Sequence, residues 1–156
     1  MKTTFSFLLL LTGLVLQAQD TVRTYYAPEF KNLKEVYTIL NGDSTKIHGN
    51  YTKYFEAGEV AMKGNFEQGT PEGVFFEYYE DGQVLSKTTY QSGEKTGPFE
   101  VYARSGEPIQ KGAYEEGALN GVVKTFFENG QLKSEIKFDK GTPSGQAKEY
   151  FPGGQL

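Results

Sequence analysis

The chain has 156 residues, a formal net charge of −4, one histidine and no cysteine. An acidic surface repels phosphate, which argues against nucleic acid or anionic lipid as a partner. Without cysteine the chain can form neither a disulfide nor a thiolate metal site. We therefore expect one small domain that binds no cofactor.

The first eighteen residues carry the features of a secretory signal peptide. Lys2 precedes an apolar run, Phe5 to Leu16, which is followed by Ala18 and the polar pair Gln19-Asp20. The run is shorter than the roughly 20 apolar residues of a membrane-spanning helix. We predict a signal peptide over 1–18, cleavage after Ala18, a periplasmic or extracellular mature protein and no membrane insertion after cleavage.

Residues 19–48 precede the regular part of the sequence. The segment 35–40 reads as a strand, Asn41-Gly42-Asp43 as a turn, and 46–48 leads into the next segment. Because stacked repeats need atypical terminal units, we expect a degenerate capping hairpin over 33–48. An irregular lead-in is expected over 20–32.

From Gly49 the sequence repeats every 24 residues without insertion or deletion. Four complete blocks and the start of a fifth span 49–156, and each opens with a glycine: Gly49, Gly73, Gly97, Gly121 and Gly145. A fixed period of this length is typical of stacked repeat arrays. Each block reads as two strands, so the predicted fold is all-β: an open, single-layer antiparallel meander of tandem β-hairpins, forming an elongated twisted rod or trough.

A second set of glycines marks the hairpin turns: Gly58, Gly82, Gly106, Gly130 and Gly154. A two-residue type I′ turn would impose a positive φ on Ala57 and Ser105 as well as on the glycine, and alanine tolerates positive φ poorly. We therefore expect a type I turn closed by one left-handed glycine. Segments such as 69–73 are expected to be connecting loops.

This turn pairs an aromatic residue with an apolar one in every block. The expected pairs are Tyr54 with Val60, Tyr78 with Val84, Tyr102 with Pro108, Phe126 with Leu132 and Tyr150 with Leu156. Counting by twos from Val60 places Phe66 on the same face. The aromatic members of these pairs form a predicted structural ladder: Tyr54, Tyr78, Tyr102, Phe126 and Tyr150.

The opposite face is expected to be mixed, with Tyr51, Phe75 and Phe99 beside Lys63, Lys87 and Lys111. Aromatic residues that directly follow the ladder are candidates for a partner-binding stripe: Phe55, Tyr79, Phe127 and Phe151. A contiguous exposed aromatic stripe usually marks a binding surface. The competing interpretation is that these rings only stabilise a thin sheet.

The segment Tyr78-Tyr79-Glu80-Asp81-Gly82-Gln83-Val84, followed by Tyr90 and Gly93, resembles the MORN repeat. It is most similar to a bacterial variant often labelled as the antitoxin of a toxin–antitoxin pair. The resemblance covers about 49–156 and implies a meander of hairpins that contacts other proteins. Better-known MORN units contain Tyr-x-Gly-x-Trp; this chain has no tryptophan, which argues against a lipid-head-group role.

No residue constellation indicates catalysis. His48 is the only histidine, and no nucleophile or carboxylate outside the repeat pattern accompanies it. We expect it to be a polar residue at a loop-to-strand junction. Acidic residues such as Glu56, Glu80 and Glu128 recur beside turns, where solvation explains them. The sequence predicts no enzyme and no catalytic, metal or cofactor-binding residue.

Three functions remain open. The first is an exported scaffold that binds another protein through the aromatic stripe. The second is a binder of cell-envelope glycans, although sugar-binding hairpin repeats rely on tryptophan. The third is an antitoxin-like inhibitor of a secreted toxin. Because the fifth hairpin stops after its turn, the sequence also predicts a strand edge open to self-association.

Overall fold

The computed structural model describes residues 19–29 and 31–155, and the predicted signal peptide lies outside them. Within this part of the chain there are thirteen strands and no helix. The strands are β1 Gln19–Tyr25, β2 Leu33–Leu40, β3 Asp43–Tyr54, β4 Val60–Glu67, β5 Thr70–Tyr78, β6 Val84–Gln91, β7 Glu94–Tyr102, β8 Pro108–Glu115, β9 Ala118–Leu119, β10 Gly121–Phe126, β11 Leu132–Asp139, β12 Thr142–Pro143 and β13 Lys148–Glu149.

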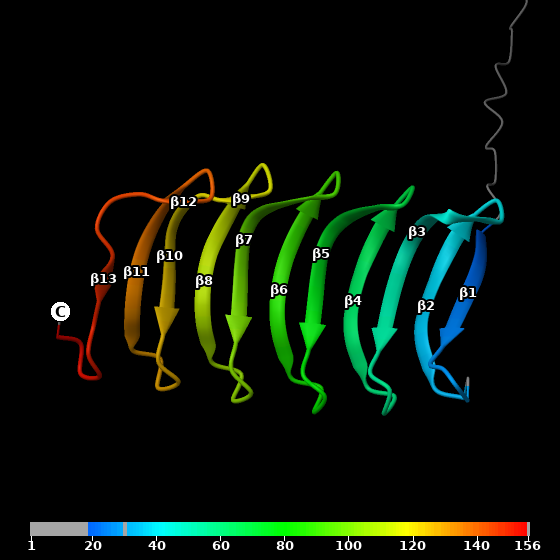
Figure 1. Cartoon of the computed structure of the whole chain (residues 1–156), viewed down its shortest axis with the longest axis horizontal. Coiled ribbons are helices and arrows are strands. Elements are labelled where there is room, and N and C mark those ends of the chain that lie inside the picture. The colour runs from blue at the N-terminus through cyan, green and yellow to red at the C-terminus, as the bar shows by residue number, and fades with distance from the viewer. Residues whose placement is uncertain (1–18, 30, 156) are drawn as a thin grey trace, which may run out of the picture.

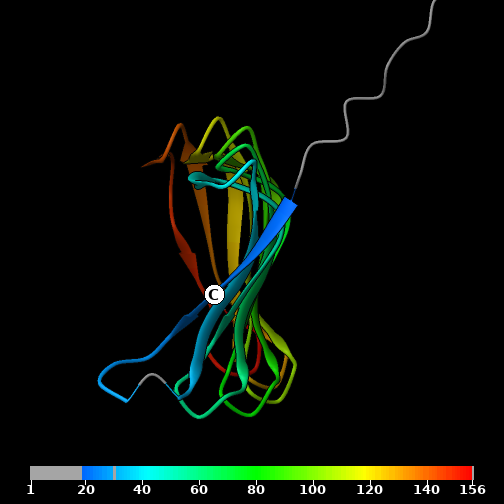
Figure 2. The same ribbon diagram turned by 90° about the vertical axis from the view of Figure 1, so that its right-hand side faces the viewer.

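The strands form one open antiparallel sheet, as predicted. They lie side by side in chain order, with β9 and β10 both on β8, and β12 and β13 both on β11 (Figure 1). Seen from the end of the array, the strands change direction progressively, which is the usual twist of a sheet (Figure 2). Each hairpin therefore lies beside its neighbours in the chain, and none of the residues that the structure describes forms a second layer over either face.

The hairpin turns have the predicted geometry. In the first, the Phe55 amide donates to the Glu59 carbonyl at 2.8 Å, and the Gly58 amide donates to the Phe55 carbonyl at 3.0 Å. Gly58 has φ 108° and Gly82 has φ 83°. The five described non-glycine residues with positive φ all lie outside these turns: Asn41, Gln68, Ser92, Glu116 and Lys140. One left-handed glycine thus closes each of the first four turns, whereas Gly153 and Gly154 both have positive φ in the fifth.

The prediction that loops connect the hairpins is wrong. Gln68 (φ 49°) and Gly69 (φ 86°) form a two-residue turn, flanked by the strand pair Glu67 and Thr70. These angles are those of a type I′ turn, so β5 already begins at Thr70 where a loop was expected. The sequence conceals this turn because glutamine occupies the position that usually holds asparagine or aspartate.

The expected assignment of side chains to faces is also partly wrong, because every hairpin contains a bulge. Tyr54 pairs with Val60 as predicted, but Lys53 pairs with Met62, which leaves Ala61 as an extra residue. Leu85, Ile109 and Lys133 are the equivalent extra residues. An extra residue inverts the alternation along the strand. Phe66 therefore lies on the face opposite to Val60.

We name the two faces by their side chains. The ring face carries Tyr37, Tyr51, Phe66, Phe75, Tyr90, Phe99 and Tyr114. The lysine face carries the predicted ladder together with Lys63, Lys87, Lys111, Lys124 and Lys148. The expectation that the lysines accompany Tyr51 and Phe75 is thus corrected. The ladder pairs themselves are confirmed from Tyr54 to Phe126, whereas Leu156 lies outside the described residues.

The ring face holds most of the buried core. Phe75, Phe99 and Val123 are only 8%, 6% and 5% exposed. Neighbouring ring centroids lie 5.5 Å apart between Phe66 and Phe75, and 4.9 Å apart between Phe75 and Tyr90. Edge-to-face contacts of this kind stabilise a sheet that lacks a second layer. These side chains are therefore buried by rings on neighbouring strands of the same sheet.

The lead-in differs from the sequence expectation. Residues 20–32 were expected to be irregular, but 19–25 form β1, which pairs with β2 through contacts such as Val22 with Tyr37. The β-branched residues Thr21 and Val22 suit a strand once a partner is available. His48 also lies within β3 and not at a junction.

Candidate functional site

The candidate stripe occupies the first position of successive hairpin turns. In each of the five turns, the amide of the first residue donates to the carbonyl four residues on, and the carbonyl of the first residue accepts from the amide of the turn glycine. These first residues are Phe55, Tyr79, Ala103, Phe127 and Phe151. We call these five positions the turn column. Their backbone hydrogen bonds are all 2.8–3.0 Å long. Each hairpin therefore presents one side chain of the turn column along the same edge of the sheet, held by the same backbone hydrogen bonds.

Exposure differs strongly along the turn column. Phe151 is 70% exposed, whereas Ala103 is only 9% exposed and carries no ring. Phe55, Tyr79 and Phe127 are half-buried. The column therefore consists of two aromatic pairs separated by Ala103, and Phe151 is its most accessible ring.

Tyr79 has a structural task of its own. Its hydroxyl donates to the Tyr102 carbonyl at 2.8 Å, and the Arg104 guanidinium lies 4.6 Å from the centre of its ring. Arg104 also forms a 2.8 Å ion pair with Asp81. These three contacts join the second hairpin to the third.

The lysine face presents a groove between the same two hairpins. It has a volume of about 390 Å³ and is lined by Phe76, Gln83, Val84, Lys87, Tyr102 and Gly106. The rings of Phe76 and Tyr78 lie 6.5 Å apart on this face. The groove thus combines aromatic walls with one ammonium group, a combination that sequence reasoning missed because it placed Lys87 on the other face.

A hydrogen-bonded group beside this groove perturbs two pKa values. The Tyr102 hydroxyl donates to Glu100 at 2.5 Å, and the Lys111 ammonium lies 2.9 Å from the same carboxylate. The hydrogen bond from Tyr102, then the one from Lys111, lower the pKa of Glu100. The hydrogen bond to Glu100 in turn raises the pKa of Tyr102 to about 12.

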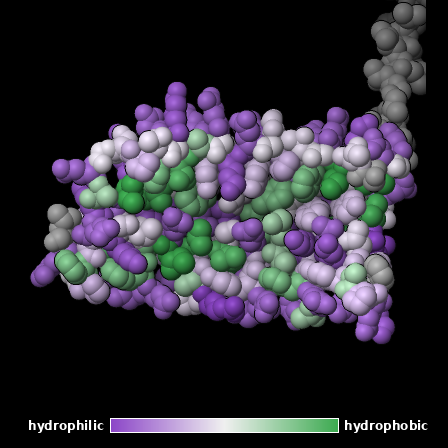
Figure 3. Space-filling model, viewed as in Figure 1, coloured by the Kyte–Doolittle hydropathy of each residue, from purple (hydrophilic) through white to green (hydrophobic). Residues whose placement is uncertain are grey.

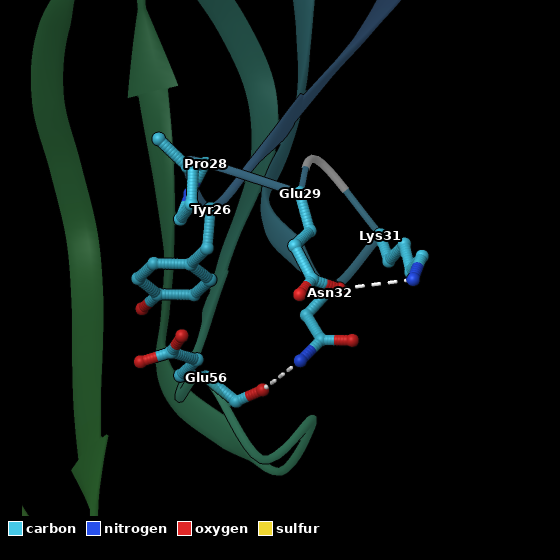
Figure 4. A pocket seen from close by; sticks show the side chains of 7 residues that line it. Tyr26, Pro28, Glu29, Lys31, Asn32 and Glu56 are labelled. Atoms are coloured by element: carbon cyan, nitrogen blue, oxygen red, sulfur yellow. Dashed lines mark hydrogen bonds and ion pairs between the residues drawn. The ribbon is translucent and has the colours of Figure 1, made fainter.

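A smaller cavity of about 170 Å³ lies where the lead-in meets the first turn (Figure 4). Its polar groups mostly bind one another: Lys31 pairs with Glu29 at 2.9 Å, and the Asn32 amide donates to the Glu56 carbonyl at 2.9 Å. No described part of this cavity offers a cluster of free polar groups converging on a ligand.

The described residues contain no group of three or more histidine, cysteine or acidic side chains that could hold a metal ion. His48 has a buried Nδ1 without a hydrogen-bond partner among them, and the Thr38 hydroxyl donates to the His48 backbone carbonyl, not to the imidazole. The part of the chain that the structure describes holds no helix long and apolar enough to cross a membrane.

Three segments of the chain match a family model described as the MORN repeat variant: 47–68, 71–92 and 119–140. Each match starts two residues before the opening glycine of a block and covers one hairpin. This is a MORN repeat protein. No curated protein matches the chain.

One hairpin of this MORN array departs from the family pattern, since no match covers 95–116. Here Ala103 replaces the turn-column ring and Pro108 replaces the aliphatic residue after the turn. The structure nevertheless keeps the hairpin, because Tyr102 still pairs with Pro108 and Ile109 is still the bulged residue. The backbone of this hairpin thus keeps the pairing of the other hairpins, although two of its side chains depart from the repeat pattern.

Proposed function

We propose that this MORN repeat protein is a non-enzymatic, exported scaffold that binds another protein through its turn column. The supporting observation is the presentation of Phe127 and Phe151 by turns with the same backbone hydrogen bonds, with Phe151 70% exposed. Aromatic side chains on a rigid backbone lose little entropy on binding and dominate protein interfaces. A partner lying along the turn edge would contact both rings at once.

Several contacts make the neighbourhood of the column suitable for such a partner. The Lys133 ammonium lies 5.8 Å from the centre of the Phe127 ring, which leaves this side chain half-covered. Exposed acidic residues such as Glu56, Glu80 and Glu128 surround the turns. Figure 3 shows apolar patches along the array bordered by hydrophilic atoms at the edges. An aromatic centre with a polar rim is the usual anatomy of a protein interface.

Export is supported by the order of features in the first twenty residues: Lys2, an apolar run and a small residue before a polar pair. N-terminal sequencing of the protein recovered from the cell envelope tests it. A new N-terminus at Gln19 agrees with the proposal, whereas an intact Met1 on the cellular protein contradicts it.

The binding proposal is tested with the mature protein as bait in an envelope extract. Phe127→Glu combined with Phe151→Glu should reduce recovery of a specific partner at least tenfold, because a carboxylate cannot replace a buried ring at an interface. Val122→Glu is the matched control, since Val122 is 48% exposed but lies on the lysine face. Equal recovery by both variants and the wild type would contradict the role of the turn column.

A further inference from the structure

A straight row of side chains crosses the lysine face at right angles to the strands. Each member is the direct cross-strand partner of the next: Thr52, Lys63, Phe76, Lys87, Glu100, Lys111, Lys124, Glu135 and Lys148. We call it the cross-strand row. It holds five lysines and two glutamates, although the whole chain has a net charge of −4. Positive charge is therefore concentrated in a line.

The row contains an unfavourable pair. Lys111 and Lys124 are direct partners across β8 and β10, and like charges opposite each other destabilise a sheet. Each ammonium is held by a glutamate on its other side, Lys111 by Glu100 at 2.9 Å and Lys124 by Glu135 at 3.1 Å. An anion lying between the two ammonium groups would relieve their repulsion.

The first half of the row has two lysines that form no ion pair among the described residues. Lys87 faces Glu100 on one side, but that carboxylate is bound by Lys111 and Tyr102. Lys63 and Lys87 both pair across the sheet with Phe76, and neither forms an ion pair with any residue that the structure describes. Strands lie about 4.8 Å apart, so Lys63, Lys87 and Lys111 follow one another at intervals of about 10 Å. The aromatic groove lies at the centre of this segment, with Lys87 at its wall.

The edges of the sheet restrict the shape of an anionic ligand. Acidic residues occupy the turns on one side of the row, including Glu56, Glu80 and Asp81, and the strand ends on the other, including Glu67 and Glu115. A planar anionic membrane or a nucleic-acid duplex would approach these carboxylates as closely as the lysines. A narrow linear chain can follow the row and avoid both edges.

We propose that the lysine face binds a linear acidic polysaccharide, laid along the cross-strand row. Carboxylates spaced one per disaccharide would meet Lys63, Lys87 and the Lys111–Lys124 pair, and one sugar ring would stack on the aromatic walls of the groove. Flat sugar rings suit this surface better than an acidic peptide does, because the strands in the middle of the sheet have already paired their backbone donors and acceptors. The cross-strand row lies on the strands, whereas Phe127 and Phe151 lie in the hairpin turns, so the two proposals are tested by different substitutions.

The test measures binding of the mature chain to hyaluronate, which carries one carboxylate per disaccharide, by calorimetry at low salt. Wild type should bind, and Lys63→Gln combined with Lys87→Gln should bind at least tenfold more weakly. The matched control is Lys53→Gln, which removes a lysine of the same strand pair on the ring face. Phe76→Leu should weaken binding at least threefold without changing the circular dichroism spectrum.

Three further probes separate the sources of affinity. Uncharged dextran should not bind, and poly-glutamate and vesicles of phosphatidylglycerol should bind at least tenfold more weakly than hyaluronate. Hyaluronate binding that is absent in the wild type, or equal in the Lys63/Lys87 and Lys53 variants, overturns the proposal. Binding of poly-glutamate or vesicles as tight as that of hyaluronate also overturns it, in favour of an acidic protein or a membrane.

Discussion

The ring of Phe75 lies against the backbone of Gly64, so close that a Cβ on Gly64 would stand 2.3 Å from two ring atoms. The same relationship recurs two hairpins later, where a Cβ on Gly112 would stand 2.6 Å from the ring of Phe99. Gly64 and Gly112 do not adopt positive φ. Both are glycine because a buried ring occupies the place of a side chain.

Gly64→Ala should therefore lower the free energy of unfolding by about 1–3 kcal/mol, the usual cost of overpacking a core. The same substitution in a Phe75→Ala background should cost much less, because the clashing ring is gone. Urea denaturation of the four proteins in this cycle measures the effect. Equal costs in both backgrounds would show that the ring does not lie over Gly64.

The hairpin turns predict a different sensitivity. Gly82→Ala should cost about 1–2 kcal/mol, because Gly82 has φ 83° and a side chain is disfavoured there. Ala57→Gly, in the equivalent turn, is the control and should change stability by less than about 0.5 kcal/mol, since Ala57 has no positive φ. If Ala57→Gly stabilised the protein by as much as Gly82→Ala destabilised it, the turn would be type I′.

The hydroxyl of Tyr79 should contribute measurably to stability. Tyr79→Phe removes its hydrogen bond to the Tyr102 carbonyl and should cost about 0.5–1.5 kcal/mol. Tyr78→Phe is the matched control, because the hydroxyl of Tyr78 has no hydrogen-bond partner among the described residues. Thermal unfolding of both variants tests this prediction. Equal melting temperatures would show that the Tyr79 hydroxyl does not stabilise the contact between the hairpins.

The Glu100 group predicts a loss of stability in acid. Hydrogen bonds from Tyr102 and Lys111 hold the pKa of Glu100 below its ordinary value of 4.5, so the folded state binds fewer protons than the unfolded state. This contribution is present above that value and is lost as the pH falls through the lower folded-state pKa. Glu100→Gln should therefore flatten the dependence of unfolding free energy on pH below 4.5. An unchanged slope in that variant would contradict the lowered pKa.

The sequence predicted the period, the hairpin turns and the pairing of Tyr54 with Val60 because a glycine with positive φ recurs at the same position of every one of these turns. It did not reveal the bulge at Ala61, since apolar residues such as Ala61, Leu85 and Ile109 fit either face. Because the extra residue in each hairpin was not foreseen, Phe66 was predicted on the wrong face. The turn at Gln68 was missed because only its second residue is glycine.

The same cause limited the prediction of binding surfaces. The turn column precedes the bulge, and the structure places Phe55 and Tyr79 at the first position of their hairpin turns. The lysines follow the bulge, so Lys63 and Lys87 were placed among the wrong neighbours. The cross-strand row depends on pairings between hairpins, such as Lys111 with Lys124, which no pattern within one repeat can indicate.

The most direct test of the repeat lattice is the excision of one hairpin. Deletion of 73–96 joins Glu72 to Gly97, and should leave a shorter, folded sheet with an unchanged circular dichroism signal per residue and cooperative unfolding. Deletion of 73–95 leaves one residue too many, which turns the following side chains to the wrong face and should lower the melting temperature far more. Equal melting temperatures of the two deletions would contradict a sheet built from interchangeable 24-residue hairpins in register.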